Sequence, residues 1–249
     1  MSLPGKEIFR TYDDLGPIQV FDDGNKRYLG FGSGDEQSCL MKTEPQLLLH
    51  EYARSMMLVL LFHTPKNVTF LGLGGGSLVS CVYHHFPSSA LKVIELRQKV
   101  VDTAYRFFQL PRGERLDVSV MDAGRYLKKA KRGSSDLIFC DLYGPDGLDE
   151  QQLEPVFNER CYDLLSDDGW LVLNCWQNHR GEAEGLRSLM DWFPEIKVCS
   201  VPGGNWTILA SKRNHDISDK KLEEKAKVLS EKLGFSLSTS LKRLEGFGF

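Results

Sequence analysis

Residues 68–77, which read VTFLGLGGGS, decide the fold of this chain. An apolar, β-branched run enters four closely spaced glycines, and a helical pattern follows over residues 77–86. Glycines let a backbone approach a ligand closely, and the start of a helix offers unpaired amides to polar groups. We therefore predict a ligand-binding strand–turn–helix unit, although a tight turn alone would also use glycines. Its predicted ligand contacts are Gly72, Gly74, Gly75, Gly76 and Ser77.

Strand-like and helix-like segments alternate on both sides of this turn. The predicted strands are 68–73, 91–96, 116–121, 136–141, 169–175, 196–201 and 206–211. The predicted helices are 44–62, 77–86, 98–108, 124–130, 155–165 and 181–193. Such alternation builds a mostly parallel sheet that is covered on both faces. Residues 202–205, Pro-Gly-Gly-Asn, are too few for a crossover helix, so the last two strands form an antiparallel hairpin. The expected fold is an α/β, class I methyltransferase-like (Rossmann-like) sheet of seven strands ending in this hairpin.

Two further regions flank the sheet. Residues 1–43 read as short extended pieces around the turn at 22–25, Asp-Asp-Gly-Asn, and predict a small N-terminal β-hairpin region. Residues 214–249 hold an amphipathic helix over 218–233 with Gly234 as its stop. We therefore divide the chain into 1–43, a nucleoside-binding domain over 44–213, and a helical tail over 214–249.

The composition narrows the range of partners. Lys and Arg number 31 against 34 Asp and Glu, a net charge of −3, so a basic surface for nucleic acid is not expected. The longest apolar stretch, 56–62, is far shorter than the roughly 20 residues that span a bilayer, and no membrane contact is expected. The six cysteines lack zinc-ligand spacing and are assigned to core packing, with no metal. We expect a cytoplasmic chain.

Acidic residues stand at the ends of three successive predicted strands. Glu95, Asp122 and Asp141 each follow an apolar run, so their side chains should face one cleft. The acid after the second strand of such sheets binds ribose hydroxyls, which assigns Glu95 to the ribose, and Asp122 with Ala123 is placed to meet an adenine amino group. Each acid could instead cap the next helix. A dinucleotide site is disfavoured because position 77 is serine where that fingerprint needs glycine.

From about residue 13 to residue 212 the sequence resembles the spermidine synthase (polyamine aminopropyltransferase) family, and more closely its divergent bacterial spermidine-synthase-like branch. The residues that carry the resemblance are Asp35-Glu36, His50-Glu51-Tyr52, LGLGGGS at 71–77, Val93-Ile94-Glu95, Met121-Asp122-Ala123, Asp136-Leu137-Ile138 with Asp141, Phe157-Asn158, LLSDDG at 164–169, VPGGNW at 201–206 and LASK at 209–212.

The resemblance implies a reaction. The family transfers an aminopropyl group from decarboxylated S-adenosylmethionine to an amine or polyamine and releases methylthioadenosine. Asp141 matches the family's base, which takes a proton from the attacking ammonium. Tyr52 matches a substrate-binding tyrosine, and Tyr143 and Trp176 are candidates for the wall of the acceptor site, although both could also pack in the core. A homodimer built through the N-terminal strands is implied as well.

Other residues depart from the family's pattern. Ser77 stands where the family usually has an aspartate that grips the donor's ammonium, Gly144 where a second aspartate holds the acceptor, and Ala53 where glutamine follows the tyrosine. A serine at position 77 would not repel the carboxylate of intact S-adenosylmethionine. Two alternatives therefore stay open: an S-adenosylmethionine-dependent methyltransferase, and a non-catalytic binder of adenosyl metabolites.

Overall fold

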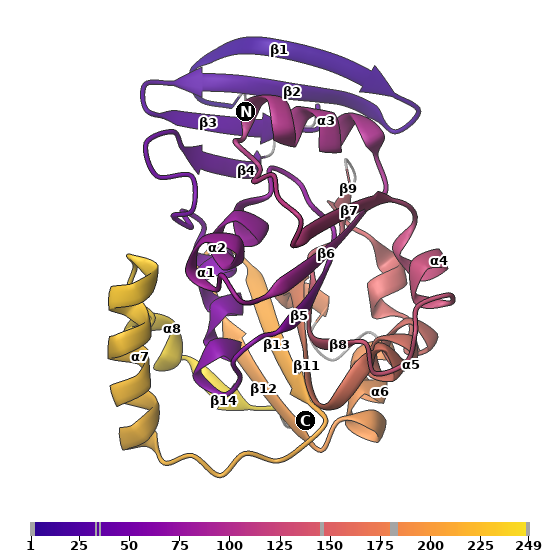
Figure 1. Ribbon diagram of the computed structural model, residues 1–249, viewed down its shortest axis with the longest axis vertical. Coiled ribbons are helices and arrows are strands. Elements are labelled where there is room, and N and C mark those ends of the chain that lie inside the picture. Colours follow the sequence, from indigo (N-terminus) through magenta and orange to yellow (C-terminus); the bar gives the residue numbers. More distant parts are fainter. Residues whose placement is uncertain (1–2, 33, 35, 145–146, 180–183, 248–249) are drawn as a thin grey trace.

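The structure is a computed structural model that describes residues 3–32, 34, 36–144, 147–179 and 184–247. Two large sheets dominate it (Figure 1). The N-terminal sheet has four antiparallel strands in sequence order: β1 (Lys6–Asp13), β2 (Gly16–Asp23), β3 (Lys26–Gly30) and β4 (Glu36–Met41). The expected N-terminal β region is therefore present, with β1 as an additional edge strand that was not predicted.

The central sheet has eight strands in the order β14-β12-β13-β11-β8-β5-β6-β7. Its strands are β5 (Asn67–Leu71), β6 (Ala90–Glu95), β7 (Leu116–Val120), β8 (Ser135–Cys140), β11 (Leu165–Trp176), β12 (Glu195–Ser200), β13 (Asn205–Ser211) and β14 (Leu244–Gly246). The five strands from β11 to β7 run parallel, and β13 and β12 form the expected antiparallel hairpin. The α/β methyltransferase-like fold is thus confirmed.

Helices cover both faces of this sheet. They are α1 (Glu51–Met56), α2 (Ser77–His85), α3 (Gln98–Phe107), α4 (Ala123–Leu127), α5 (Pro155–Leu164), α6 (Glu184–Trp192), α7 (Asp219–Leu233) and α8 (Ser238–Leu241). Short 3₁₀ helices span Met57–Leu61, Glu150–Leu153 and Gln177–His179. Figure 1 shows α1, α2 and α7 on one side of the sheet and α4, α5 and α6 on the other.

The parallel strands are apolar on both faces because both faces are covered. Along β5, Phe70 packs into the core under α1, α2 and α7, while its neighbour Leu71 packs into the core under α4, α5 and α6. Phe139 and Cys140 on β8 divide in the same way. This alternation leaves the carboxyl ends of the strands as the place where polar side chains can gather.

Helix α3 joins the two sheets. Val101 and Ala104 on one side of α3 pack into the central core, whereas Val100 packs with Ile18 and Leu29 of the N-terminal sheet. The N-terminal sheet is thereby held over the carboxyl ends of β5 and β6, above the glycine turn.

One predicted helix was too long. The pattern over 44–62 predicted a single helix, but α1 begins only at Glu51, and residues 44–50 form turns. Leu48 in this segment is fully buried in the central core, and His50 adopts an extended backbone before the helix starts. Tertiary burial of Leu48 therefore overrides the helical spacing of the apolar residues.

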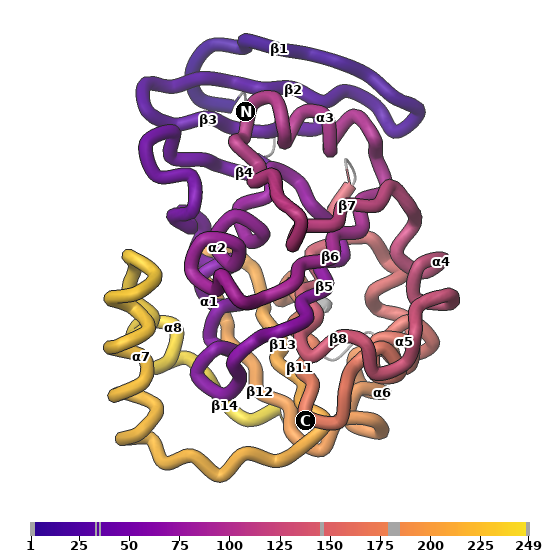
Figure 2. The backbone as a smooth tube through the Cα atoms, viewed as in Figure 1, coloured from indigo at the N-terminus to yellow at the C-terminus, as the bar shows by residue number. Residues whose placement is uncertain are grey.

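The tail adds an eighth strand to the seven that were predicted. Figure 2 shows the chain leaving β13, passing along the edge of the molecule to α7, and returning through α8 to β14. There Leu244, Glu245 and Gly246 pair with β12 in antiparallel fashion. No helix in the described part of the chain is both long and apolar enough to cross a bilayer.

Candidate functional site

A cleft of about 660 Å³ lies at the carboxyl ends of the parallel strands. Its floor comes from the turn after β5, from Glu95 at the end of β6, from Asp141 just after β8, and from Asn174 and Trp176 at the end of β11. Residues of the N-terminal sheet and its turns, among them Phe31, complete the wall. This volume is within the range of small-molecule sites, which is roughly 300–1,000 Å³.

Gly72 brings the glycine turn against the segment that carries Asp141. Its φ is +96°, and a Cβ there would lie 2.3 Å from the backbone carbonyl oxygen of Asp141. The Gly72 amide donates to the carbonyl of Ile94 at 2.9 Å, and the Asp141 amide donates to the carbonyl of Leu71 at 2.9 Å. Only glycine tolerates both the backbone conformation and the close approach.

The rest of the turn is docked on β4. The Gly75 amide donates to Ser38 Oγ at 2.8 Å, and a Cβ at Gly74 would lie 2.9 Å from the same oxygen. Gly76, with φ +79°, precedes α2, and Ser77 is the first residue of that helix. Of the five predicted contacts in the turn, Gly72 and Gly74 line the large cleft, and Ser77 lines the smaller cavity described below.

Glu95 holds the turn in place as well as facing the cleft. It is 8% exposed, and its carboxylate accepts from the amides of Leu73 at 3.0 Å and Arg97 at 2.9 Å. Burial raises the pKa of this carboxyl group, and the amide hydrogen bonds oppose that rise. Glu95 therefore lines the cleft and also has a structural task that the sequence did not indicate, while its role toward a ribose stays a prediction.

Asp122 and Ala123 lie outside the walls of the cleft. The Asp122 carboxylate caps α4 by accepting from the Arg125 amide at 2.7 Å. The Gln151 side chain lies beside it, with Nε2 3.4 Å from Asp122 Oδ2 and Oε1 accepting from the Gly124 amide at 3.1 Å. Ala123 is buried in the core. The capping alternative thus describes the contacts of Asp122, and its role toward adenine stays a prediction.

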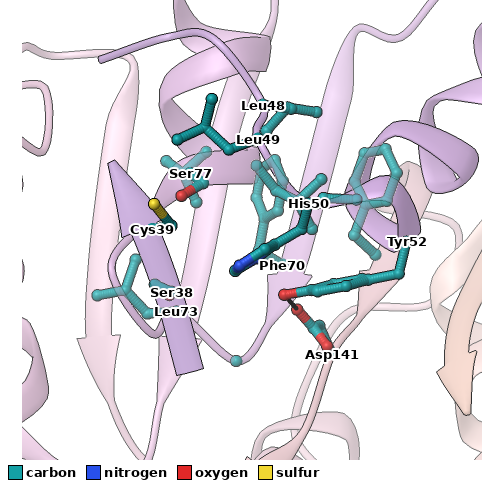
Figure 3. Close-up of a pocket in the computed structure, with 15 residues that line it drawn as sticks. Ser38, Cys39, Leu48, Leu49, His50, Tyr52, Phe70, Leu73, Ser77 and Asp141 are labelled. Atoms are coloured by element: carbon teal, nitrogen blue, oxygen red, sulfur yellow. Dashed lines mark hydrogen bonds between the residues drawn. The ribbon is translucent and has the colours of Figure 1, made fainter. Parts of the chain in front are cut away.

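Asp141 has two side-chain partners from different elements. Asn174 Nδ2 on β11 donates to Asp141 Oδ1 at 2.9 Å. The Tyr52 hydroxyl on α1 lies 3.4 Å from Asp141 Oδ2, and Figure 3 shows these two side chains pointing toward one another. Burial raises the pKa of Asp141, while Asn174, the nearby His50 and Tyr52 act in the opposite direction. A carboxylate with a raised pKa is a better proton acceptor than one in water.

A second cavity, of about 30 Å³, opens beside Asp141. Figure 3 shows Ser38, His50, Tyr52, Ser77 and Asp141 among its walls. The His50 ring stacks on the Tyr52 ring with centroids 5.4 Å apart, and His50 Nε2 lies 2.5 Å from Glu36 Oε1. A contact between Glu36 and His50 therefore joins the N-terminal sheet to the residue that precedes α1, next to the carboxylate.

Tyr143 and Trp176 form an aromatic corner at the end of the cleft beyond Asp141. Their ring centroids are 5.8 Å apart, and the Tyr143 hydroxyl donates to the Asn174 carbonyl at 3.4 Å. Trp176 lies against Gly147, where a Cβ would come 2.5 Å from the indole. Both rings line the cleft, as expected for acceptor-site residues.

The buried thiols near the site are not nucleophiles. Cys140 and Cys175 flank Asp141, and burial raises the pKa of both thiols, that of Cys175 to about 12. A protonated thiol is a poor nucleophile. Their position in the core agrees with the assignment of the cysteines to packing.

Sequence reasoning missed Asn174 and Asn205. Asn174 is 2% exposed, and its Oδ1 accepts from Asn205 Nδ2 at 3.0 Å. Asn174 is also the single polar residue in the apolar run 171–175, and a buried amide in such a run needs partners. This single polar residue in an apolar run was the available sign of a site residue, but its partner Asn205 lies on another strand and could not be found from the run itself.

The comparisons with known proteins agree with this geometry. The spermine/spermidine synthase domain matches residues 49–208, which is more than half of the chain. The chain belongs to the spermine/spermidine synthase family. A polyamine aminopropyltransferase of Chromobacterium violaceum is 30% identical over 237 residues, covering 92% of this chain and 89% of that protein. The family resemblance expected from the motifs is therefore confirmed.

Solved structures extend the family's likeness to the fold. A probable spermidine synthase from Corynebacterium glutamicum superposes with a TM-score of 0.79 at 20% identity, covering 98% of this chain and 91% of that one. Human methyltransferase-like protein 13, solved with SAH, gives a TM-score of 0.63 at 23% identity and covers 74% of this chain and 89% of that one. The fold is thus shared by spermidine synthases and by a methyltransferase.

Proposed function

We propose that this member of the spermine/spermidine synthase family is an aminopropyltransferase. It would transfer the aminopropyl group of decarboxylated S-adenosylmethionine to an amine or polyamine and release methylthioadenosine. The observation that carries the proposal is the Asp141 carboxylate, which burial makes more basic and which lies where the cleft, the small cavity and the aromatic corner meet.

The adenosyl end of the donor fits the part of the cleft near the glycine turn. Gly74 exposes backbone there, Glu95 offers a carboxylate to ribose hydroxyls, and Leu15, Phe31 and Leu96 supply apolar surface for the base. This arrangement supports a nucleoside whose sulfonium end points toward Asp141. Glu95 and Asp141 are acidic, which favours the decarboxylated donor over intact S-adenosylmethionine, because the intact donor carries a carboxylate beside its two positive groups.

Asp141 would then act as the base. The acceptor ammonium gives one proton to the Asp141 carboxylate. The neutral nitrogen then attacks the methylene carbon of the aminopropyl group that is bonded to sulfur. The new C–N bond forms as the C–S bond breaks, and the bonding pair passes to sulfur, which leaves as the neutral thioether of methylthioadenosine. Holding both reactants in line supplies much of the acceleration of such a displacement.

The aromatic corner supports an amine as the acceptor. The rings of Tyr143 and Trp176 line the cleft, and aromatic rings attract an alkylammonium group. Deprotonation at Asp141 requires one nitrogen of the acceptor to lie beside that carboxylate, and the chain of the acceptor would extend over the rings.

One assay tests the reaction. The protein is incubated with each donor, decarboxylated or intact S-adenosylmethionine, and with a panel of mono- and diamines. Methylthioadenosine and S-adenosylhomocysteine are followed by mass spectrometry. We expect methylthioadenosine from the decarboxylated donor only when an amine is present. Formation of S-adenosylhomocysteine from the intact donor would favour methyl transfer. If neither product forms with either donor, a non-catalytic binder of adenosyl metabolites would be favoured.

Two variants control this assay. Asp141→Asn should abolish methylthioadenosine release while calorimetry finds near-normal affinity for methylthioadenosine. Asp168→Asn removes an aspartate that makes only an exposed ion pair with Arg213, and should leave turnover unchanged. Equal turnover in the two variants would remove Asp141 from its role.

We also propose a cytoplasmic homodimer that associates through the N-terminal sheet. β1 is the edge strand of this sheet, and Ile8 and Tyr12 on it are 41% and 59% exposed. Light scattering coupled to size exclusion should give twice the chain mass, and Tyr12→Lys should shift the population toward the monomer. A monomeric wild type at micromolar concentration would contradict this assembly.

A further inference from the structure

Asn174 connects Asp141 to a residue on another strand. Asn174 Nδ2 donates to Asp141 Oδ1 at 2.9 Å, and Asn174 Oδ1 accepts from Asn205 Nδ2 at 3.0 Å. Asn205 is the first residue of β13, where it pairs with Trp176 of β11, two residues beyond Asn174. Because side chains two residues apart share one face of a strand, Asn205 can reach Asn174 across the strand pair.

The donor and acceptor groups determine how the Asn174 amide must be turned. An ionised carboxylate only accepts hydrogen bonds, so the NH₂ group of Asn174 must face Asp141, and its oxygen must face a donor. Asn205 supplies that donor. The backbone of Asn174 is tied down as well, since its carbonyl accepts from Gln152 Nε2 at 3.2 Å and from the Tyr143 hydroxyl at 3.4 Å.

We propose that Asn205 is a positioning residue for the transfer reaction, acting through Asn174 to keep the Asp141 carboxylate oriented and ionised. The inference rests on the proposed function, in which Asp141 is the base. Asn205 does not bond Asp141 itself. Asn205 acts by holding the Asn174 side-chain amide in one orientation. If that amide turned by about 180°, its oxygen would face the Asp141 carboxylate and the two oxygens would repel each other.

Several titratable groups face Asp141 from the elements packed around it. Hydrogen-bonded or charged neighbours favour its ionised form, whereas burial and nearby acidic groups disfavour it. These neighbours are His50 and Tyr52 from the start of α1, Glu36 of β4 through its contact with His50, Cys140 of β8, Tyr143 of β9 (Tyr143–Gly144) and Cys175 of β11. The variants below leave all of these groups in place.

The test compares pH profiles of kcat/KM for methylthioadenosine release. Asn174→Ala removes the donor to Asp141, and Asn205→Asp places a second acceptor next to the Asn174 amide. Each should move the acidic limb upward by about one pH unit, a roughly tenfold gain in proton affinity, because a hydrogen bond to a charged group is lost or contested. Asn205→Ala, which adds no charge, should move the limb in the same direction by less.

Gln177→Glu is the matched charge control. Gln177 donates to the backbone carbonyls of Val201 and Asn205, and among the described residues no hydrogen bond joins its side chain to the Asn174 amide, so an added charge there should move the limb by less than Asn205→Asp does. In the double variant Asn174→Ala/Asn205→Asp, the second change should add little to the first. The inference would be overturned if the shifts of the acidic limb in the two single variants added up in the double variant. It would also be overturned if Asn205→Asp lowered kcat without moving the acidic limb of kcat/KM.

A readout without turnover separates this inference from the proposed function. If the wild type releases no methylthioadenosine, the aminopropyltransferase proposal fails. The Asp141 carboxyl can still be titrated by carbon-13 NMR, with Asp141→Asn providing the assignment. A higher midpoint in Asn174→Ala and Asn205→Asp than in the wild type supports the inference, and equal midpoints overturn it.

Discussion

Replacing Gly72 by alanine should destabilise the protein at the point where the Asp141 carboxylate, the proposed base, is positioned. With φ at +96°, an L-residue there costs about 1–2 kcal/mol of backbone energy. The new Cβ would also lie 2.3 Å from the backbone oxygen and 3.0 Å from the backbone carbon of Asp141, so one strand end must move. Overpacking of this kind adds about 1–3 kcal/mol.

The total of about 2–5 kcal/mol is a large part of the 5–15 kcal/mol that stabilises a typical domain. Gly133→Ala provides the matched control, because Gly133 has φ +67° but no atom within 4 Å of its Cβ position. It should lose only the backbone cost, about 1–2 kcal/mol. The difference between the two variants isolates the contact with Asp141.

Urea unfolding followed by circular dichroism measures both free energies by linear extrapolation. Methylthioadenosine release by the folded fraction should fall sharply for Gly72→Ala and not for Gly133→Ala, since only the former displaces the backbone of Asp141. If Gly72→Ala costs no more stability than Gly133→Ala, the close approach of the turn to Asp141 is not what requires glycine there.

Three other predictions concern the proposed acceptor site, the proposed base and a partly buried histidine. Under the proposed function, in which the amine lies over the aromatic corner, Trp176→Ala should raise KM for the amine roughly tenfold and leave KM for the donor unchanged; an unchanged KM for the amine would contradict this. Tyr52→Phe removes a hydroxyl that favours ionised Asp141, so the acidic limb of kcat/KM should move to higher pH, by less than in Asn174→Ala because the contact is longer, 3.4 Å against 2.9 Å. Burial lowers the pKa of His85 from 6.5 to about 4. As the pH falls below 6.5, the unfolded chain takes up a proton at this histidine while the folded chain does not. The free energy of unfolding is therefore lower near pH 4 than above pH 6.5. Urea unfolding at about pH 7 and pH 4.5 should show a loss of stability that is smaller in His85→Gln, and an equal loss in both proteins would refute the assignment.

Much of the fold could be predicted because its main features are local. Most of the parallel strands are apolar runs of the length that a covered sheet requires, although the edge strand β7 alternates apolar and polar residues, and the glycine turn follows the first of them. The acids at 95, 122 and 141 were placed correctly at strand ends for the same reason. Their environments were not predictable: Asp122 caps α4, whereas Asp141 faces the cleft.

The elements that were missed depend on partners far along the chain. β14 is three residues long and exists because it pairs with β12, about 45 residues earlier. The segment before α1 departs from its helical spacing because Leu48 is drawn into the core. Neither event leaves a periodic pattern in its own sequence.

By itself, the sequence determined the alternation of strands and helices, the glycine turn and the acids at the strand ends, since these depend on residue type and spacing within one element. Only the tertiary structure decided which of those acids lies in the cleft, that Ser38 binds the turn, and that Asn205 orients Asn174 toward Asp141. Such contacts join residues separated by tens of positions, and their geometry is set by how the two sheets and α3 pack together, which no local pattern records.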